Sequence, residues 1–475
     1  MSFSQTPAAA STQRFPSVSC MGLPVPNINA QAAEEVGTAS KKIPFTIITS
    51  DLLIPGDGDP LTNGTVVSQG KLIVWVGPKS DLPEEYTRSK HKSYHVPYMM
   101  PGLWDCHVHF MATPNDPDEQ MAAVGLGPLS MHPTEVGARL TKECWTAIQR
   151  GYTSLRDCAG YGCEMSKAVE DGGIVGPNIY SVGSALSQTA GHGDSFAVPP
   201  GDALLNFGVS SIAAGYHGSG VTCLVDGVDE CRRGIRLQIR RGAKCIKILA
   251  SGGVLSRDDN PLYAQFCKEE LEAMVEEASR MDRTVAAHVH GKPGILAAAR
   301  AGVSSVEHVT FADQECVDLL KEKDIIYVAT RTIVTNLVNT GGVGLPKKIW
   351  EKVKLTNSNH LNAYKLAIKN NVKIALGTDT MPGDAKAQEL QYAVEAGMTN
   401  LEAIKAATAT AALTVKGQAP LTGQIKVGYE ADIIGVLENP VEDVRVLQPI
   451  SNIGWVWKGG RLFKGPNIGP WGEDA

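Results

Sequence analysis

The sequence predicts an α/β protein built on a (β/α)8 barrel, the TIM-barrel fold, with a small β-sandwich domain formed from its N- and C-terminal segments. Three observations predict it. Short apolar runs alternate with amphipathic helical stretches through the middle of the chain. β-Branched runs separated by turn residues flank that segment on both sides. Polar side chains that can bind metal close several of the apolar runs, which is where such a barrel carries its catalytic residues.

The length of 475 residues suits a large barrel with a small accessory domain. The first residues are rich in Ser, Ala and Pro and show no periodicity, whereas runs such as FTIITSDLLI and KLIVWVG begin after them. Similar runs return near the C-terminus, and neither set is long enough to bury a core alone. We therefore expect a loose N-terminal tail (1–42), a small antiparallel β unit that is the first part of a β-sandwich (43–100), the barrel (101–418), the second part of the sandwich (419–468) and a C-terminal tail (469–475).

The barrel strands are expected where apolar runs end in polar residues. Stretches between them, such as KEELEAMVEEASRMD, repeat apolar residues at spacings of three and four, as amphipathic helices do. A doubly wound open sheet is the alternative, but no Gly-x-Gly-x-x-Gly follows the first strand. The expected strands are 102–109, 153–156, 178–181, 244–249, 284–288, 304–308, 325–329 and 373–376.

Composition excludes several classes of function. The net charge is −6 and no basic run could follow a phosphate backbone, so nucleic acid is not an expected partner. The ten cysteines are scattered without a C-x-x-C pair, which favours free, structural thiols in a reducing compartment. The chain shows neither a secretory signal nor a membrane-spanning run, so we expect a cytoplasmic protein without membrane contact.

The segment PGLWDCHVHF, residues 101–110, is the first candidate for chemistry. Strand side chains alternate between faces, so His107 and His109 point the same way. Two imidazoles on one face can form half of a metal site. From this motif alone, an equally good interpretation is that the two histidines lie in a loop and bind no metal.

Other strand ends supply candidate partners. His288 and His290 end the run TVAAHVHG, His308 ends GVSSVEHV, and Asp379 ends KIALGTDT. A single histidine in such a place is usually structural, but several at one predicted barrel mouth favour a metal centre. Lys247, in KCIKILASGG, cannot bind metal as an ammonium. It could form a carbamate with CO₂ or pair with a barrel carboxylate, and the residues alone leave both open.

Taken together, these strand ends resemble the amidohydrolase superfamily, and especially its binuclear members with a carbamylated lysine. The stretches GYTSLRD, GPNIYSVGSALSQTAGHGD, IRRGAKCIKILASGGVLS and AAHVHG are similar to the subgroup of Xaa-Pro dipeptidases, related carboxypeptidases and imidazolonepropionase-like proteins. DLLIPGDG and MPGLWDCHVHF are especially similar to fungal amidases of that subgroup. The resemblance covers residues 44–465 and implies two divalent metal ions per chain, expected to be Zn²⁺.

The resemblance also implies a role for each ligand. His107, His109 and Asp379 would bind the more buried ion, His288 and His308 the second, and Lys247, carbamylated by CO₂, would bridge both together with a hydroxide. Asp379 would accept the proton of that hydroxide and deliver it to the leaving amine. The second ion would polarise the scissile carbonyl.

Residues outside this set have competing interpretations. His192, in AGHGD, is a candidate to hydrogen-bond the carbonyl oxygen of the substrate, or else a surface histidine. His290 suits substrate contact or support of a metal ligand. Arg257 could pair with a substrate carboxylate, although a solvated arginine is favoured. Arg156 and Asp157 could form an ion pair that supports the barrel mouth, or could touch substrate. Cys106, Cys158 and Cys245 are assigned to packing.

The leading hypothesis is hydrolysis of a small amide or peptide-like bond in an N-acyl amino acid or dipeptide. The resemblance implies N-acyl-phenylalanine amides of the ochratoxin type as substrate. Alternatives are an Xaa-Pro dipeptidase or carboxypeptidase, a mononuclear deaminase or lactam hydrolase, and a non-catalytic scaffold; the complete ligand set disfavours the last. The resemblance also implies a homo-oligomer, with an octamer as one such assembly. The segments 111–134, 183–225 and 331–350 are expected to form the substrate pocket.

Overall fold

The computed structural model describes residues 43–111, 131–209, 221–384 and 386–473. From residue 44 onward these residues belong to one compact unit. The predicted N-terminal tail lies outside the described residues. So do residues 112–130 and 210–220, which fall in two of the segments expected to line the pocket.

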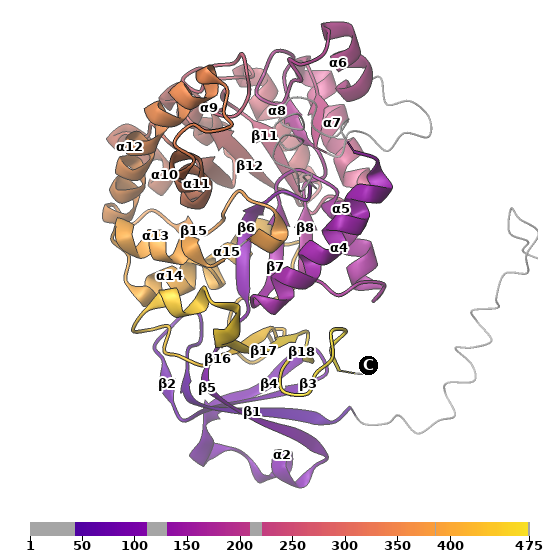
Figure 1. The fold of residues 1–475 in the computed structure, drawn as a ribbon, viewed down its shortest axis with the longest axis vertical. Coiled ribbons are helices and arrows are strands. Elements are labelled where there is room, and N and C mark those ends of the chain that lie inside the picture. Colours follow the sequence, from indigo (N-terminus) through magenta and orange to yellow (C-terminus); the bar gives the residue numbers. More distant parts are fainter. Residues whose placement is uncertain (1–42, 112–130, 210–220, 385, 474–475) are drawn as a thin grey trace, which may run out of the picture. The chain divides into compact units, whose positions relative to one another are not determined.

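Parallel strands at eight successive positions form the barrel, as predicted (Figure 1). Each predicted strand agrees with an observed one to within one residue at either end. Buried β-branched and other apolar residues dominate these strands because both of their faces are covered. The strands are β6 (Leu103–Val108), β7 (Tyr152–Asp157), β8 (Asn178–Ser181) with β9 (Ala185–Ser187), β11 (Cys245–Leu249), β12 (Thr284–Val289), β13 (Ser305–His308), β14 (Ile326–Val328) and β15 (Ile374–Ala375).

Two joints close the barrel. At the third position the strand is split: β8 pairs with β7, β9 pairs with β11, and the backbone N–H of Lys244 donates to the carbonyl of Ser181 at 2.8 Å. A short strand, β10 (Thr222–Leu224), pairs with the other edge of β9. After β15 the chain returns to β6, where Val108 and Thr380 form a parallel bridge. The last strand position therefore lies beside the first.

Amphipathic helices cover the barrel. In α4 the buried residues Val136, Leu140, Cys144 and Ala147 recur every three or four positions, which places them on one face. None of the described helices has both the length and the apolar character needed to cross a bilayer. The covering helices are α4 (Pro133–Gln149), α5 (Gly162–Glu170), α7 (Gly227–Arg241), α8 (Lys268–Arg280), α9 (Lys292–Ala301), α10 (Gln314–Glu322), α11 (Arg331–Asn339), α12 (Lys347–Lys369), α13 (Gln388–Ala396) and α14 (Asn400–Ala406).

A second sheet of eight strands joins the two ends of the described chain, as the sequence predicted. The first segment does not form a purely antiparallel unit, however, because the connection through α2 (Glu84–Arg88) carries the chain across β1 and β5 then runs parallel to it. The order is β18 (Arg461–Lys464), β17 (Ile453–Lys458), β16 (Ile433–Val436), β5 (His91–Pro101), β1 (Phe45–Leu53), β3 (Gly64–Gln69) and β4 (Leu72–Pro78), with β2 (Leu61–Thr62) on β1.

This sheet curls until its edge strand β4 meets the segment just before β16. Leu72, at the start of β4, forms an antiparallel bridge with Glu430, and the N–H of Ile73 donates to the carbonyl of Tyr429 at 2.8 Å. The curl encloses a separate apolar core that includes Ile48 and Trp457. One continuous sheet thereby produces the two facing layers of a β-sandwich.

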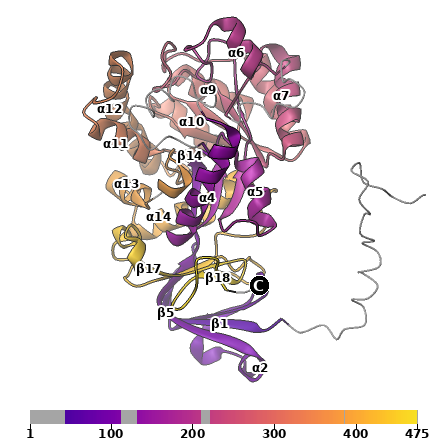
Figure 2. The same cartoon turned by 45° about the vertical axis from the view of Figure 1, so that its right-hand side comes forward.

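The second sheet lies against the amino ends of the first barrel strands, as Figure 1 shows, and Figure 2 shows the same sheet from another side. The N–H of Gly102, just before β6, donates to the carbonyl of Asp432 at 2.9 Å. The ammonium of Lys464 donates to the carbonyl of Gln149 at 2.8 Å, shortly before β7. The carboxyl ends of the barrel strands are therefore left for the functional site.

Candidate metal centre and active site

The polar residues predicted at the strand ends come together at the carboxyl end of the barrel. His107 lies in β6 and Lys247 in β11, His288 lies in β12 and His308 ends β13, while Asp379 follows β15. The side chains of His107, Lys247, His288 and His308 are almost fully buried. Four strands separated in sequence thus contribute side chains to one enclosed cluster.

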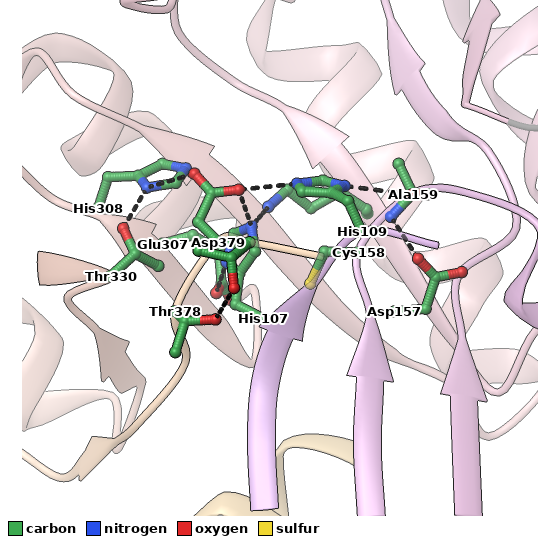
Figure 3. Close-up of polar contacts among 12 residues, drawn as sticks. His107, His109, Asp157, Cys158, Ala159, Glu307, His308, Thr330, Thr378 and Asp379 are labelled. Atoms are coloured by element: carbon green, nitrogen blue, oxygen red, sulfur yellow. Dashed lines mark hydrogen bonds and ion pairs between the residues drawn. The ribbon is translucent and has the colours of Figure 1, made fainter. Parts of the chain in front are cut away.

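The cluster begins with His107, His109 and Asp379 (Figure 3). Asp379 Oδ1 lies 2.9 Å from His109 Nε2 and 3.6 Å from His107 Nε2. The N–H of Asp379 donates to the carbonyl of His107 at 2.7 Å, and Asp379 has a φ of 59°. A left-handed conformation is unfavourable for a non-glycine residue, so the barrel closure holds Asp379 in a strained turn toward the histidines.

The other ring nitrogens of these histidines are held by fixed groups. His107 Nδ1 lies 2.8 Å from Glu307 Oε2, and His109 Nδ1 lies 3.1 Å from the carbonyl of Ala159. An imidazole bound in this way by one nitrogen presents the other as a ligand atom in a defined direction. In both residues the remaining nitrogen, Nε2, faces Asp379.

A second group, formed by His288, His290 and His308, lies beside the first. The ring centroids of His288 and His308 are 4.6 Å apart, and those of His290 and His308 are 5.0 Å apart. His308 Nδ1 lies 2.7 Å from Thr330 Oγ1, and His290 Nδ1 lies 2.7 Å from Thr310 Oγ1. In this group, and in the group of His107, His308 and Asp379, ligand atoms lie within 4.8 Å of one another.

Lys247 points into the same cluster. Its Nζ lies 3.4 Å from His107 Nε2, and the residue is 2% exposed. Across residues 43–111, 131–209, 221–384 and 386–473, no carboxylate lies within 4.0 Å of this ammonium. Of the two interpretations left open by the sequence, pairing with a barrel carboxylate therefore has no partner in the described chain.

Arg156 and Glu307 form a buried ion pair beneath the histidines. Arg156 Nη2 lies 2.8 Å from both oxygens of Glu307, and its Nη1 lies 2.9 Å from Ser305 Oγ. Arg156 Nε also donates to the carbonyl of Cys106. Arg156 thus supports the barrel, which was one of its two expected roles. The expected ion pair with Asp157 is wrong: the partner of Arg156 is Glu307, whereas Asp157 accepts hydrogen bonds from Ser181 and from nearby backbone N–H groups.

Burial keeps most of the imidazoles neutral. It lowers the pKa of His107 to about 4 and that of His290 to about 3, and it holds the pKa values of His288 and His308 well below the ordinary value. Burial opposes ionisation of Asp379, but the charge of His107 and the hydrogen bond from His109 outweigh it and lower the pKa to about 2. Neutral imidazoles and an ionised carboxylate are the forms that bind metal.

His192 lies at the edge of the cluster and not on the open surface. Its ring stacks on that of His288 with 4.3 Å between centroids and 22° between planes. Its Nδ1 lies 2.8 Å from Ser256 Oγ and 3.7 Å from Asp259 Oδ2. The nitrogen left for a substrate is therefore Nε2.

Other predicted candidates lie apart from the cluster. The guanidinium of Arg257 pairs with Asp258 at 2.5 Å and donates to the carbonyl of Phe196 at 2.6 Å, and its side chain is 59% exposed. The favoured interpretation of a solvated arginine fits these contacts. Cys106, Cys158 and Cys245 are buried free thiols, and burial raises their pKa values, for Cys158 to about 12. They pack as neutral thiols.

Sequence reasoning missed several residues that hold the site. Glu307 and Thr330 contact His107 and His308, and Asp259 with Lys352 contacts the loop around His192. One signal was available, since Glu307 directly precedes His308 in a strand that is otherwise apolar or small. Lys352 lies in a helix among other lysines and carried no such signal.

The donor set fits divalent cations. Imidazole nitrogens and a carboxylate suit zinc and similar metals, and two adjoining groups that share His308 can hold two ions side by side. An α/β barrel with such a set at the carboxyl ends of its strands defines a metal-dependent barrel enzyme.

The chain belongs to the amidohydrolase family, whose model matches residues 98–463. It is 55% identical over 450 residues to the ochratoxinase of Aspergillus niger, which covers 94% of this chain and 93% of the relative. The crystal structure of that ochratoxinase superposes with a TM-score of 0.86 at 56% identity, over 91% of this chain and 98% of the other. The resemblance to fungal amidases is confirmed.

More distant relatives confirm the subgroup. A Xaa-Pro dipeptidase crystallised with methionine in its active site has a TM-score of 0.75 at 27% identity, over 89% of this chain and all of the other. An imidazolonepropionase of Pseudomonas fluorescens is 23% identical over 404 residues, 79% of this chain and 87% of the relative. The protein is therefore an amide-hydrolysing enzyme, and the scaffold hypothesis is wrong.

Proposed function

We propose that the protein hydrolyses the amide bond of N-acyl amino acids, with ochratoxin A-type amides of phenylalanine as the specific case. One observation carries this proposal, the 55% identity to an ochratoxinase over 94% of the chain. The buried cluster at the barrel mouth supports it, because amide hydrolysis needs an activated water and a group that protonates the leaving amine.

We also propose the cofactors. Two divalent ions, Zn²⁺ in our assignment, would be held by His107, His109 and Asp379 and by His288 and His308, with Lys247 carbamylated between them. When bound, such ions make a water nucleophilic at neutral pH and polarise the scissile carbonyl. The burial of Lys247 and the absence of a described carboxylate partner support the carbamate, whose two oxygens would replace a positive charge beside His107.

Asp379 is the proposed proton carrier. It is ionised and acceptor-only, and its strained turn holds it against His107 and His109. It would take the proton of the attacking water and pass it to the nitrogen of the leaving amine. His192 and His290 are proposed to contact the substrate, since the ring of His192 stacks on His288 and that of His290 lies against both His288 and His308.

The test of the proposed function is a substrate panel. Purified protein is assayed with ochratoxin A, N-benzoyl-phenylalanine and Xaa-Pro dipeptides, before and after chelation and after zinc is restored. We expect the N-acyl-phenylalanine amides to give the highest kcat/KM and chelation to abolish turnover reversibly. Hydrolysis of the Xaa-Pro dipeptides alone would overturn this substrate assignment.

Metal content tests the binuclear assignment directly. Elemental analysis of the purified protein should find close to two divalent ions per chain. A variant that lacks His288 should retain one ion, because the inner group does not use that residue. One ion per chain in the unmodified protein would contradict the assignment and favour a mononuclear deaminase or lactam hydrolase.

Lys247 has a test of its own. Lys247→Ala should abolish turnover, and added short carboxylic acids should partly restore it by supplying bridging oxygens. Protein exchanged with ¹³C-bicarbonate should show a carbamate carbon resonance that Lys247→Ala lacks. Full turnover in the variant, or no such resonance in the unmodified protein, would refute the carbamate.

A dipeptidase or carboxypeptidase without ochratoxin activity is the second candidate. It is favoured by the likeness to the Xaa-Pro dipeptidase, which covers that whole chain. The panel separates the two functions. We further propose that the protein is a homo-oligomer, to be checked by light scattering of the purified chain.

A further inference from the structure

The loop that follows β11 encloses the ring of His192. A Cβ added to Gly253 would lie 2.0 Å from His192 Cε1, so only glycine lets the ring approach the backbone this closely. Ser256 Oγ holds Nδ1 at 2.8 Å, and Gln265 Oε1 accepts from the backbone N–H of His192 at 3.0 Å. With the stack on His288, these contacts leave the ring little freedom to turn.

Lys352 of α12 holds this loop in place. Its ammonium lies 3.0 Å from the carbonyl of Gly253, 2.7 Å from that of Ser256 and 3.0 Å from Asp259 Oδ1. Asp259 is 3% exposed in its side chain and Lys352 13%. One lysine from a distant helix thereby binds the glycine, the serine and the aspartate that surround His192.

The directions of these hydrogen bonds determine which ring nitrogen carries the proton. Asp259 is a carboxylate that accepts from Lys352 and from the N–H of Gly253, so the Ser256 hydroxyl donates to it. A serine hydroxyl has one proton. Ser256 Oγ can then only accept from His192, which places the proton of the neutral ring on Nδ1 and a lone pair on Nε2.

We propose that Lys352, Asp259 and Ser256 form a positioning chain that keeps neutral His192 as the Nδ1–H tautomer, so that Nε2 accepts a hydrogen bond from the N–H of a secondary amide substrate. This inference rests on the proposed function and deepens it. Donation from His192 to the carbonyl oxygen, the role expected from the sequence, would need the proton on the other nitrogen.

A preference for one class of amide follows. N-Acyl-phenylalanine amides carry a hydrogen on the scissile nitrogen, whereas the tertiary amide of an Xaa-Pro bond has none. An acceptor at His192 Nε2 therefore favours secondary amides. A tertiary amide would leave this nitrogen without a hydrogen-bond donor, and enzymes discriminate strongly against substrates that leave a buried polar group unpaired. His192 would be a specificity-determining residue, and Lys352 would act through Asp259 and Ser256.

The tautomer can be measured without any activity. Zinc-loaded protein with ¹⁵N-labelled histidine rings is examined by NMR at pH 8, and the His192 signal is assigned by its absence in His192→Gln. We expect a protonated Nδ1 and an unprotonated Nε2 in the unmodified protein, and loss of that single form in Ser256→Ala. A protonated Nε2 in the unmodified protein would overturn the proposal.

Kinetics then test the consequence for substrates. Ser256→Ala and Lys352→Met should lower kcat/KM for N-benzoyl-phenylalanine about tenfold, the loss expected for one hydrogen bond. Both variants should change it little for N-benzoyl-N-methyl-phenylalanine, whose scissile nitrogen carries no hydrogen. Lys352→Arg should recover most of the loss. The control is Lys348→Met, one turn away, whose ammonium pairs at 3.1 Å with Asp258 and is 75% exposed.

The outcomes distinguish this inference from the proposed function. Equal losses for the secondary and the N-methylated amide would mean that the chain is merely structural, and would overturn the acceptor role. Absence of turnover with every amide in the unmodified protein would refute the proposed function, while the NMR result would still decide the tautomer.

Discussion

Glu307 links the catalytic cluster to the barrel core through a single carboxylate. It accepts from Arg156 at 2.8 Å through both oxygens, from Ser305 Oγ at 2.6 Å, and its Oε2 lies 2.8 Å from His107 Nδ1. Burial opposes its ionisation, but the charge of Arg156 and the hydrogen bond with His107 hold the pKa of Glu307 well below its usual range. At the residue scale, the direction of His107 Nε2 therefore depends on a charge pair outside the ligand set.

Glu307→Gln tests this dependence. The variant leaves Arg156 buried without a counter-charge, so we expect a loss of about 3–5 kcal/mol in the free energy of unfolding. Metal affinity should fall about 10–100-fold, because His107 loses the charged acceptor that orients it. Chemical denaturation and competitive metal titration measure the two effects. Glu315→Gln, at an exposed site, should change neither, and an unaltered affinity in Glu307→Gln would contradict the role.

Asp379→Asn isolates proton transfer. An amide keeps the size of the side chain but cannot carry the proton, so kcat should fall by about 10²–10⁴-fold. The circular dichroism spectrum should stay unchanged. A loss of only a few-fold, with metal content intact, would place the proton carrier elsewhere.

At the scale of elements, the functional residues lie where strands end and helices begin. His308 has a φ of 69° at the end of β13, and Asp379 has a φ of 59° beyond β15. The backbone therefore turns sharply at both places. Such strain persists only when neighbouring elements are held firmly. Helix caps help to hold these elements. Thr399 and Glu402 form a capping box at the start of α14, the helix whose last turn contacts the β15 region.

The cap of α14 can be tested by itself. Thr399→Ala removes the acceptor for the N–H of Glu402, so the free energy of unfolding should fall by about 1 kcal/mol. Thr399→Ser, which keeps the hydroxyl, should recover it. Equal stabilities of the alanine and serine variants in urea denaturation would show that the cap contributes nothing.

At the scale of the whole molecule, Asp432 joins the second sheet to the barrel. Its Oδ1 accepts from the N–H of Gly459 at 2.7 Å, and its Oδ2 accepts from Asn178 Nδ2 at 3.2 Å, just where β8 begins. Its backbone carbonyl receives the N–H of Gly102. Burial of this carboxyl raises its pKa to about 6.

The raised pKa of Asp432 predicts a pH dependence. The folded protein keeps this proton up to about pH 6, whereas the unfolded chain loses it near pH 4, so the contribution of Asp432 to stability declines as pH rises through that window. The stability difference between the unmodified protein and Asp432→Asn should shift by about 2 kcal/mol in favour of the variant between pH 4 and pH 7. Urea denaturation at both pH values measures it, and a constant difference would contradict the shifted pKa.

Much of this architecture could be predicted because its signals are local. Alternation of apolar runs and amphipathic stretches located the barrel strands to within one residue at each end. A side chain that closes an apolar run must lie at the strand end, so His107, Lys247, His288, His308 and Asp379 could be expected at one mouth. The parallel pairing of β1 and β5 was not predicted, because it depends on how a connection crosses the sheet.

The sequence by itself therefore determined which groups reach the barrel mouth, since strand period and strand end are properties of neighbouring residues. Only the tertiary structure decided how those groups are held. Glu307 and Arg156 are 151 positions apart, and Lys352 lies 93 positions from Asp259. No local pattern encodes such pairs, because they form only when folding brings both partners together in a buried place. The proton on His192 is decided in the same way, by a chain of donors that exists only in the folded protein.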